Sequence, residues 1–328
     1  MTHRAMGKGL VLGVDIGGTK VAVGLVDHAG KILAQARKPM VTSAGADAAL
    51  QAVTDAIDIL SSSATADGRL QSIGICAPGP LDPKAGVVLN PPNLPSWRNF
   101  PLAAEVAKHY HLPVKVDNDA NAAALAETIW GAARGYRYVF YATIGTGIGT
   151  GIVFDGKIYH GHTGAAGEGG HVSIDYRGPV CRCGKRGCIE ILAAGPAIGA
   201  RARAKISAAP SRASSILDLA EQKVATVTSE MVGQAYAAGD PLAREVLQEA
   251  VELLTAWLGN IVDLLDPDVL VMGGGVAAML NPFFDEIKTR LPDWCVNPRA
   301  SEIPLVMAYY GADAGIAGGA ALCATDVA

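Results

Sequence analysis

The sequence predicts an α/β protein made of two similar halves around a cleft. A strand, a Gly-rich turn, a strand, a short Gly turn and a third strand follow one another from residue 9, and the same order returns about 128 residues later. Between these copies the apolar run Leu112 to Val116 leads into an Ala-rich run, which is typical of a buried strand followed by a helix. The 328 residues, half of them hydrophobic, suffice for about two domains with their own cores.

The overall charge argues against several classes of partner. The net charge is −4 and the pI is about 6.0, and no block of basic residues is present, so neither nucleic acid nor an anionic membrane surface is an expected partner. No apolar run reaches the ~18 residues of a membrane span. The first ten residues lack the apolar segment and cleavage site of a secretory signal, and we therefore expect a cytoplasmic protein.

The first Gly-rich segment, DIGGTK, lies between two predicted strands, Gly9 to Ile16 and Val21 to Val26, and a third strand covers Lys31 to Arg37. A P-loop and a dinucleotide-binding turn both need a helix after their glycines, so neither applies. Gly17 and Gly18 instead lie in a hairpin turn. They either satisfy a tight turn that needs positive φ or leave backbone N–H groups free for a phosphate.

The rest of the first half alternates between helix and strand. Helical spacing covers Ala46 to Leu60 and Pro101 to His109, and Leu70 to Cys76 is a short apolar strand. The Pro-rich loop 90–97 carries two amides and one aromatic side chain, Trp97, which we expect to be exposed. Such loops often line ligand sites, although most are only connectors.

The stretch from Val116 to Glu127 is the centre of the prediction. It places Asp117, Asn118 and Asp119 between a strand and a helix, at the mouth of the helix. Backbone N–H groups are unpaired there and the helix dipole is positive. A carboxylate at such a place can take a proton from a bound hydroxyl group, and the alternative is that Asp119 or Asn118 is simply the N-cap.

The second half repeats the pattern of the first. Tyr138 to Ile144 is a predicted strand, Gly145 to Gly151 a second Gly-rich turn, and Ile152 to Phe154 the next strand, followed by a short Gly turn. We interpret this as an internal duplication, in which each half offers a Gly hairpin to the cleft. Two opposed hairpins rich in free N–H groups would form a cradle for a polyanion.

A cysteine-rich segment predicts a metal site. Three of the six cysteines, Cys181, Cys183 and Cys188, lie within eight residues, downstream of a flexible loop that ends at His171. Three thiolates and one imidazole form the closed tetrahedral shell of structural zinc. The alternative is a lone histidine and thiols that are kept reduced.

The remaining sequence carries fewer signals. Residues 196 to 233 look irregular to helical and contain no motif. Asp240 to Leu265 predicts one or two helices, and Asp268 to Met272 a buried strand after which Gly273 to Gly275 opens a helix. Glycines at such a place either let a flat ligand or phosphate approach the backbone or allow close helix packing. Gly311 to Ala324 predicts a closely packed helix.

Taken together, these segments resemble the ROK family of bacterial sugar kinases, and its glucokinases most. The resemblance rests on DIGGTK at 15–20, APGPLD at 77–82, PPNLPSW at 91–97, DNDANAAALAE at 117–127, GTGIGTG at 145–151, GEGGH at 167–171, CRCGKRGCIE at 181–190 and GGG at 273–275. It implies a duplicated actin-like ATPase fold, related to ribonuclease H. The expected small lobe covers residues 1–118 with a C-terminal helix at about 311–328 packed back on it, and the large lobe with the zinc loop covers 119–310.

The resemblance also implies roles for individual residues. Asp119 would be the general base, and sugar hydroxyls would be held by Asn93, Asn118, Asp119, Glu168, His171 and Glu190. The phosphates would lie on Gly17, Gly18, Thr19, Lys20, Thr146 and Gly147, with Asp15 near Mg²⁺ and Gly273, Gly274 and Gly275 near the adenosine. His171, Cys181, Cys183 and Cys188 would bind zinc, so that His171 serves both zinc and sugar.

The implied function is ATP-dependent phosphorylation of a hexose at its 6-hydroxyl, glucose first, with Mg²⁺ and structural Zn²⁺, in a homodimer or homotetramer. Kinases for N-acetylmannosamine, N-acetylglucosamine or fructose share most of the motifs, and polyphosphate is an alternative donor. A sugar-responsive repressor needs a helix-turn-helix, for which the roughly eight residues before Gly9 are too few. A non-catalytic actin-like protein would leave Asp119, Glu168 and Glu190 unexplained.

Overall fold

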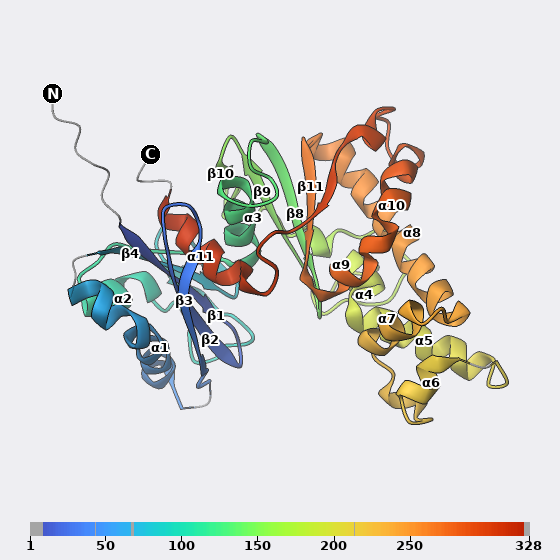
Figure 1. Ribbon diagram of the computed structural model, residues 1–328, viewed down its shortest axis with the longest axis horizontal. Coiled ribbons are helices and arrows are strands. Elements are labelled where there is room, and N and C mark those ends of the chain that lie inside the picture. The colour runs from blue at the N-terminus through green and yellow to red at the C-terminus, as the bar shows by residue number, and fades with distance from the viewer. Residues whose placement is uncertain (1–8, 43, 67–68, 213, 325–328) are drawn as a thin grey trace. The chain divides into compact units, whose positions relative to one another are not determined.

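The computed structural model describes residues 9–42, 44–66, 69–212 and 214–324, which form two compact units (Figure 1). The first unit contains the chain up to Arg137, the segment Gly151–Gly167 and the chain from Tyr309 onward. The second contains Tyr138–Thr150 and Glu168–Ala308. These units differ from the expected lobes, because helix α3 (Asp119–Ile129) belongs to the first unit, where it packs against the C-terminal helix.

The first sheet has the strand order β3-β2-β1-β4-β7. Its strands are β1 (Leu10–Ile16), β2 (Lys20–Val26), β3 (Ile32–Pro39), β4 (Leu70–Ala77) and β7 (Val114–Asn118). The three N-terminal strands pair antiparallel, whereas β4 pairs parallel with β1 and with β7. A two-stranded sheet of β5 (Leu81–Asp82) and β6 (Val87–Val88) follows β4.

Helices cover both faces of this sheet (Figure 1). On one face α1 (Ala46–Ala66) and α2 (Leu102–Tyr110) enclose the main core, to which β1 contributes Leu12, Val14 and Ile16. The alternate β1 residue Gly13 faces α11 (Ala314–Ala324) instead. Helix α1 continues to Ala66, six residues beyond the helical spacing that the sequence predicted up to Leu60.

Helix α11 packs unusually close to the first sheet. A Cβ added to Gly13 would lie 1.9 Å from the carbonyl oxygen of Ile316, and one added to Gly74 would lie 1.8 Å from that of Gly319. Only glycine fits at such contacts between backbones. The structure therefore has the closely packed C-terminal helix that the sequence predicts, while residues 325–328 of the predicted helix lie outside the described residues.

The second sheet has the order β10-β9-β8-β11-β12. Its strands are β8 (Tyr138–Ile144), β9 (Ile148–Phe154), β10 (Lys157–Ile158), β11 (Val269–Gly273) and β12 (Leu305–Met307). The strand β11 is parallel to β8, as β4 is to β1, so the second sheet repeats the arrangement of the first. The predicted duplication and the α/β fold class are confirmed.

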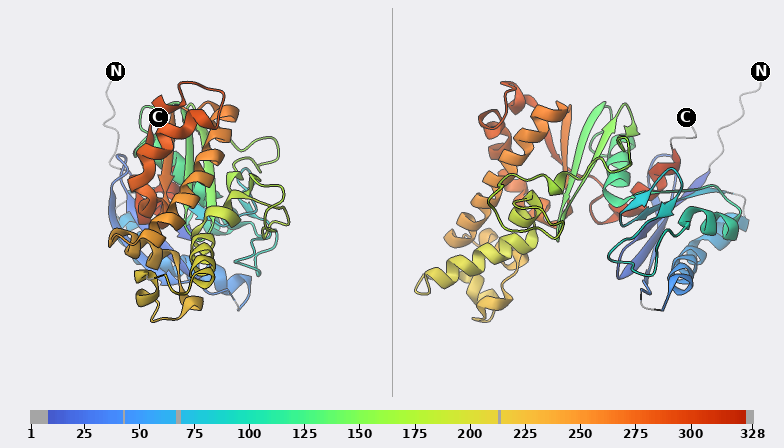
Figure 2. Two further views of the ribbon diagram at one scale, coloured as in Figure 1. Left: turned by 90° about the vertical axis from the view of Figure 1, so that its right-hand side faces the viewer. Right: turned by 180° about the vertical axis from the view of Figure 1, so that it is seen from behind.

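Helices make up most of the second unit. They are α4 (Ile189–Ala193), α5 (Gly195–Ala208), α6 (Ser215–Leu219), α7 (Ser229–Ala237), α8 (Pro241–Leu265), α9 (Gly274–Leu280) and α10 (Phe284–Arg290). The long helix α8 contacts α4, α5, α7 and α10, which lie among the yellow-green to red-orange helices of Figure 2. Its N-cap is Asp240, which accepts hydrogen bonds of 2.8 Å from two backbone N–H groups of the first turn.

Two local predictions were wrong. Trp97 is fully buried, because its ring stacks on Phe100 at 4.9 Å and its Nε1 donates to the carbonyl oxygen of Ala46 at 3.3 Å. The second Gly turn is shorter than predicted, because β9 already begins at Ile148. Among the described residues, no helix is long and apolar enough to cross a membrane.

Candidate functional site

The turn from β7 into α3 holds the two groups that the sequence singles out most strongly. Asn118 is the N-cap of α3, and its Oδ1 accepts hydrogen bonds from the N–H groups of Ala120 at 2.9 Å and Asn121 at 3.4 Å. Asp119 follows in the first turn and is accessible to solvent. Its Oδ1 also accepts from the Ala120 N–H at 2.8 Å. Because Asn118 fills the capping position, the Asp119 carboxylate is left available for chemistry.

Asp15 is the second carboxylate of interest and is the penultimate residue of β1, just before the Gly-rich segment. Its pKa is raised from 3.8 to about 6, mainly by burial and then by the charge of Asp119, while Lys20 and Arg37 oppose this shift. The pKa of Asp119 is raised as well, because its carboxyl lies deep among protein atoms although solvent reaches it. Two interacting carboxylates with raised pKa, one at the start of a helix and one near the end of a strand, are typical of an acid–base site.

We expect Asp15→Asn to raise the melting temperature near neutral pH. Between its ordinary pKa of 3.8 and about 6, the folded protein keeps a proton on Asp15 that the unfolded chain releases. Ionisation of Asp15 therefore costs stability progressively as the pH rises from about 3.8 to about 6, and above about pH 6 this cost is fully present and constant. The gain from the substitution should shrink as thermal denaturation is repeated from about pH 7 down to about pH 5, whereas a pH-independent gain would contradict the raised pKa.

The first Gly turn connects β1 to β2. The N–H of Gly17 donates to the carbonyl oxygen of Lys20 at 2.9 Å, and Thr19 and Lys20 are exposed. Neither Gly17 nor Gly18 has positive φ, so turn geometry does not require these glycines. A Cβ added to Gly18 would instead lie 3.2 Å from the Cβ of Asn93, which places the predicted sugar residue Asn93 beside the turn.

The second unit contains a cavity of about 920 Å³ beside the second Gly turn. Gly145 and Thr146 line it, and the Gly145 carbonyl oxygen accepts a hydrogen bond of 2.8 Å from the N–H of Gly195, the first residue of α5. Helix α5 lacks a side-chain cap, and the N–H groups of Ala197 and Ile198 in its first turn donate to the carbonyl oxygen of Ala194 at 2.9 and 3.1 Å. The cavity has the volume and the largely apolar walls of a small-molecule site.

A large part of the cavity wall comes from the stretch 196–233, in which the sequence analysis found no motif. Its walls include Arg203 of α5, Val227 and Thr228 before α7, and Gly233 of α7. A signal was present nevertheless. Gly195, Gly199 and Arg203 recur every four residues along α5, which places two side-chain-free positions and one cation on one helix face.

The glycines at 273–275 divide between the two roles that the sequence left open. A Cβ on Gly273 would lie 2.7 Å from the hydroxyl of Tyr141, and Gly274 has a φ of 87° and lies against the backbone of Ile144. Both serve packing. Gly275 alone of the three lines the cavity, and an added Cβ there would meet no atom within 4 Å.

Two predicted sugar-binding carboxylates lie at the starts of short helical segments of the second unit. Glu190, in the first turn of α4, accepts a hydrogen bond of 2.9 Å from the N–H of Ile148, and a Cβ on Gly147 would lie 2.6 Å from its Oε2. Glu168 precedes the 3₁₀ turn Gly169–His171 and is exposed. Trp257 of α8 fixes this turn by donating to the carbonyl oxygen of Gly169 at 3.1 Å.

The cysteine motif folds into a cluster that suits a metal ion. The ligand atoms of His171, Cys181, Cys183 and Cys188 all lie within 4.8 Å of one another. Cys183 Sγ is 3.6 Å from Cys188 Sγ, and Cys181 Sγ is 3.7 Å from His171 Nδ1. These separations match ligands about 2.0–2.3 Å from a common tetrahedral centre. Burial and the adjacent thiols raise the pKa of Cys188 to about 12, a cost that a divalent cation would remove.

A comparison with protein families identifies the chain. The family model described as "ROK family" matches residues 11–326. The chain belongs to the ROK family. As in other ROK family members, the duplicated sheets form an actin-like ATPase fold.

Individual ROK relatives are similar over nearly their whole length. A glucokinase of Streptomyces coelicolor is 34% identical over 315 residues, which covers 96% of this chain and 97% of that protein. The crystal structure of a ROK family glucokinase from Streptomyces griseus, in complex with glucose and AMPPNP, has a TM-score of 0.79 and 34% identity, and covers 96% of this chain and 99% of that one. An N-acetylmannosamine kinase of Citrobacter koseri is 30% identical over 96% of this chain and 99% of that protein.

Proposed function

We propose that this ROK family protein transfers the γ-phosphoryl group of ATP to the 6-hydroxyl of glucose. The observation that carries the proposal is the accessible Asp119 carboxylate, which has a raised pKa and is not consumed by capping α3. The similarity to glucokinases at 34% identity supports the choice of reaction and of glucose as the first substrate.

In this mechanism Asp119 is the general base. Its carboxylate accepts the proton of the 6-hydroxyl as that oxygen bonds to the γ-phosphorus, and the bond from the γ-phosphorus to the β,γ-bridging oxygen breaks, so that ADP leaves with the electron pair. Burial raises the pKa of Asp119, which makes its carboxylate a stronger base towards a bound hydroxyl group. The other sugar hydroxyls are assigned to Asn93, Asn118, Glu168, Glu190 and His171.

The nucleotide is assigned to the Gly turns and the cavity of the second unit. The phosphates would contact Gly17, Gly18, Thr19 and Lys20 of one turn and Thr146 and Gly147 of the other, and the adenosine would occupy the cavity that Gly275 lines. Magnesium bound to the triphosphate would neutralise its charge. Asp15, whose carboxyl is only partly ionised below about pH 6, would face that cation through water.

We expect Gly275→Leu to raise the KM for ATP by about tenfold or more and to leave the KM for glucose little changed. The backbone there tolerates a side chain, because an added Cβ meets no atom within 4 Å, but a larger group enters the cavity. Gly275→Ala is the graded control and should have a smaller effect. Steady-state kinetics with each substrate varied would check this, and equal ATP KM values for both variants and wild type would exclude adenosine from this cavity.

Zinc is assigned to the cysteine cluster, where it would be structural. Cys181, Cys183, Cys188 and the Nδ1 of His171 would hold the ion. Because Nδ1 faces the thiols, Nε2 on the other side of the ring remains for a sugar hydroxyl. The cluster would thereby set the orientation of the His171 ring.

The sugar itself is tested by one coupled assay with glucose, N-acetylmannosamine, N-acetylglucosamine and fructose, each offered with ATP and with polyphosphate. The proposal expects the highest kcat/KM for glucose with ATP. A higher value for N-acetylmannosamine would move the protein to the second activity found among its relatives, at 30% identity. Since buried contacts to hydroxyl and acetamido groups dominate discrimination, this ranking needs measurement rather than motif comparison.

A further inference from the structure

A second cavity, of about 650 Å³, lies in the first unit and takes no part in the proposed reaction. Its walls come from the turn between β5 and β6, from β7 and from the segment around β10. The apolar part includes Pro83, Ala85, Val114, Leu125, Ile158 and Leu322. The volume is that of a site for a small molecule rather than for a macromolecule.

Basic side chains dominate the polar part of this cavity. Lys84, Lys115, Lys157 and His160 line it, together with a single carboxylate, Asp117. The lone pairs of that carboxylate are occupied within the protein: Oδ1 accepts from the N–H of Asn118 at 2.7 Å and from Nδ2 of Asn121 at 3.2 Å, and Oδ2 lies 2.6 Å from Nε2 of His160. Three lysines thus surround a cavity whose only acid is already engaged.

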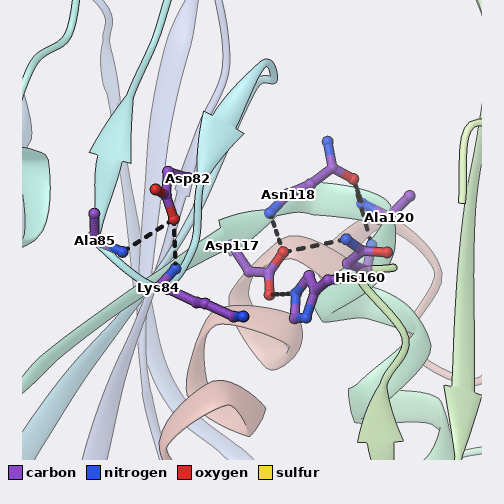
Figure 3. A network of polar contacts seen from close by, with 8 residues as sticks. Asp82, Lys84, Ala85, Asp117, Asn118, Ala120 and His160 are labelled. Carbon is purple, nitrogen blue, oxygen red and sulfur yellow. Dashed lines mark hydrogen bonds and ion pairs between the residues drawn. The ribbon is translucent and has the colours of Figure 1, made fainter. Parts of the chain in front are cut away.

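Asp117 joins this cavity to the mouth of α3 (Figure 3). It is 4% exposed, and along β7 it shares a face with Lys115, two residues away. The two oxygens connect His160, which lines the cavity, with the backbone of Asn118, the N-cap next to Asp119. A ligand that displaces the His160 ring would therefore change what holds the Asn118–Asp119 turn.

We propose that this cavity binds a small phosphate monoester, with the phosphate between the lysines and His160 and the carbon body on the apolar wall. Lysine ammonium groups are point-charge donors to phosphate. The Nε2 of His160 contacts Asp117, and its Nδ1 can donate to a phosphate oxygen when the ring is an imidazolium. The first part of this proposal, the phosphate site itself, depends only on the cavity and the residues that line it. Its second part, that occupancy changes sugar affinity through His160 and Asp117, rests on the proposed function.

Glycerol 3-phosphate is the probe, titrated into the full chain by isothermal calorimetry with Mg²⁺ and AMPPNP present to fill the phosphate turns. We expect saturable binding of one molecule per chain and none for glycerol. The double variant Lys84→Gln, Lys157→Gln should raise the Kd about tenfold or more, because it removes two charged donors. Lys31→Gln, an exposed lysine of the same unit outside the cavity, is the matched control and should leave the Kd unchanged.

Three results would overturn the site: no saturable heat, equal binding of glycerol, or an unchanged Kd in the double variant. The coupling between the cavity and the sugar site is measured separately, as the Kd for glucose with and without saturating glycerol 3-phosphate. We expect the two values to differ about fivefold or more, and saturating glucose must change the Kd for glycerol 3-phosphate by the same factor. His160→Ala should bring this factor to one. Binding without any effect on glucose would overturn the coupling, and missing glucose binding would count against the proposed function instead.

Discussion

Asp119→Asn should lower kcat by about 10²-fold or more, the usual scale of general-base catalysis. The amide cannot accept the proton of the attacking hydroxyl, yet it keeps the size of the side chain and an oxygen for the Ala120 N–H. The Kd for glucose should change far less than kcat. The substitution should also raise the melting temperature, because it removes the charge of a carboxyl that is accessible to solvent but poorly solvated, which is what raises the pKa of Asp119.

The chain offers a matched control for this variant. Asp47 is also an aspartate in the first turn of a helix, α1, but it is exposed and belongs to none of the predicted motifs. The Asp47→Asn variant should therefore have the kcat of wild type. Asn118→Ala should lower stability by about 1 kcal/mol through the lost cap. If Asp119→Asn turned over within threefold of wild type, Asp119 would be only a residue of the first turn and the assignment of the base would fail.

Cys183→Ser should remove the metal and weaken glucose binding together. Purified wild-type protein should contain one zinc per chain by elemental analysis, and the variant much less, because hydroxyl is a poor zinc ligand and only three ligands remain. Loss of the ion frees the His171 ring to rotate, so the KM for glucose should rise roughly 10-fold or more, as for other groups that orient a ligand.

Cys295→Ser is the control for thiol loss, since Cys295 is a free cysteine outside the cluster. It should keep both the zinc and the KM of wild type. A Cys183→Ser protein without zinc but with an unchanged glucose KM would separate the metal from the sugar site. Full zinc content in Cys183→Ser would show that Cys183 is no ligand at all.

The features predicted best are those that depend on a few neighbouring residues. Gly17 and Gly18 lie between two strands and can form only a short turn. The three cysteines are so close in sequence, with two glycines between them, that their thiols come together locally. The strand-to-helix change around Asn118 follows from composition, because an apolar run meets an Ala-rich one and Asn118 is a preferred cap. The repeated order of strands predicted the duplication for the same reason, since every strand and turn of it is local.

Only the tertiary structure decided which faces these elements present and what packs on them. Trp97 was predicted to be exposed because its loop is polar and Pro-rich, but Phe100 and α1 bury it. The cavity of the second unit forms from helices that meet in space, so the four-residue spacing along α5 shows only one of its walls.

The same holds for the assignment of α3 and for the cationic cavity. Helix α3 joins the first unit because α11, nearly 200 residues later in the chain, packs against it. Lys84, Lys115 and Lys157 are far apart in the sequence and line one cavity only because β7 and the segment around β10 come together. Local sequence determines the conformation of each segment through backbone sterics and capping, whereas the contacts between distant segments depend on close packing of the whole unit.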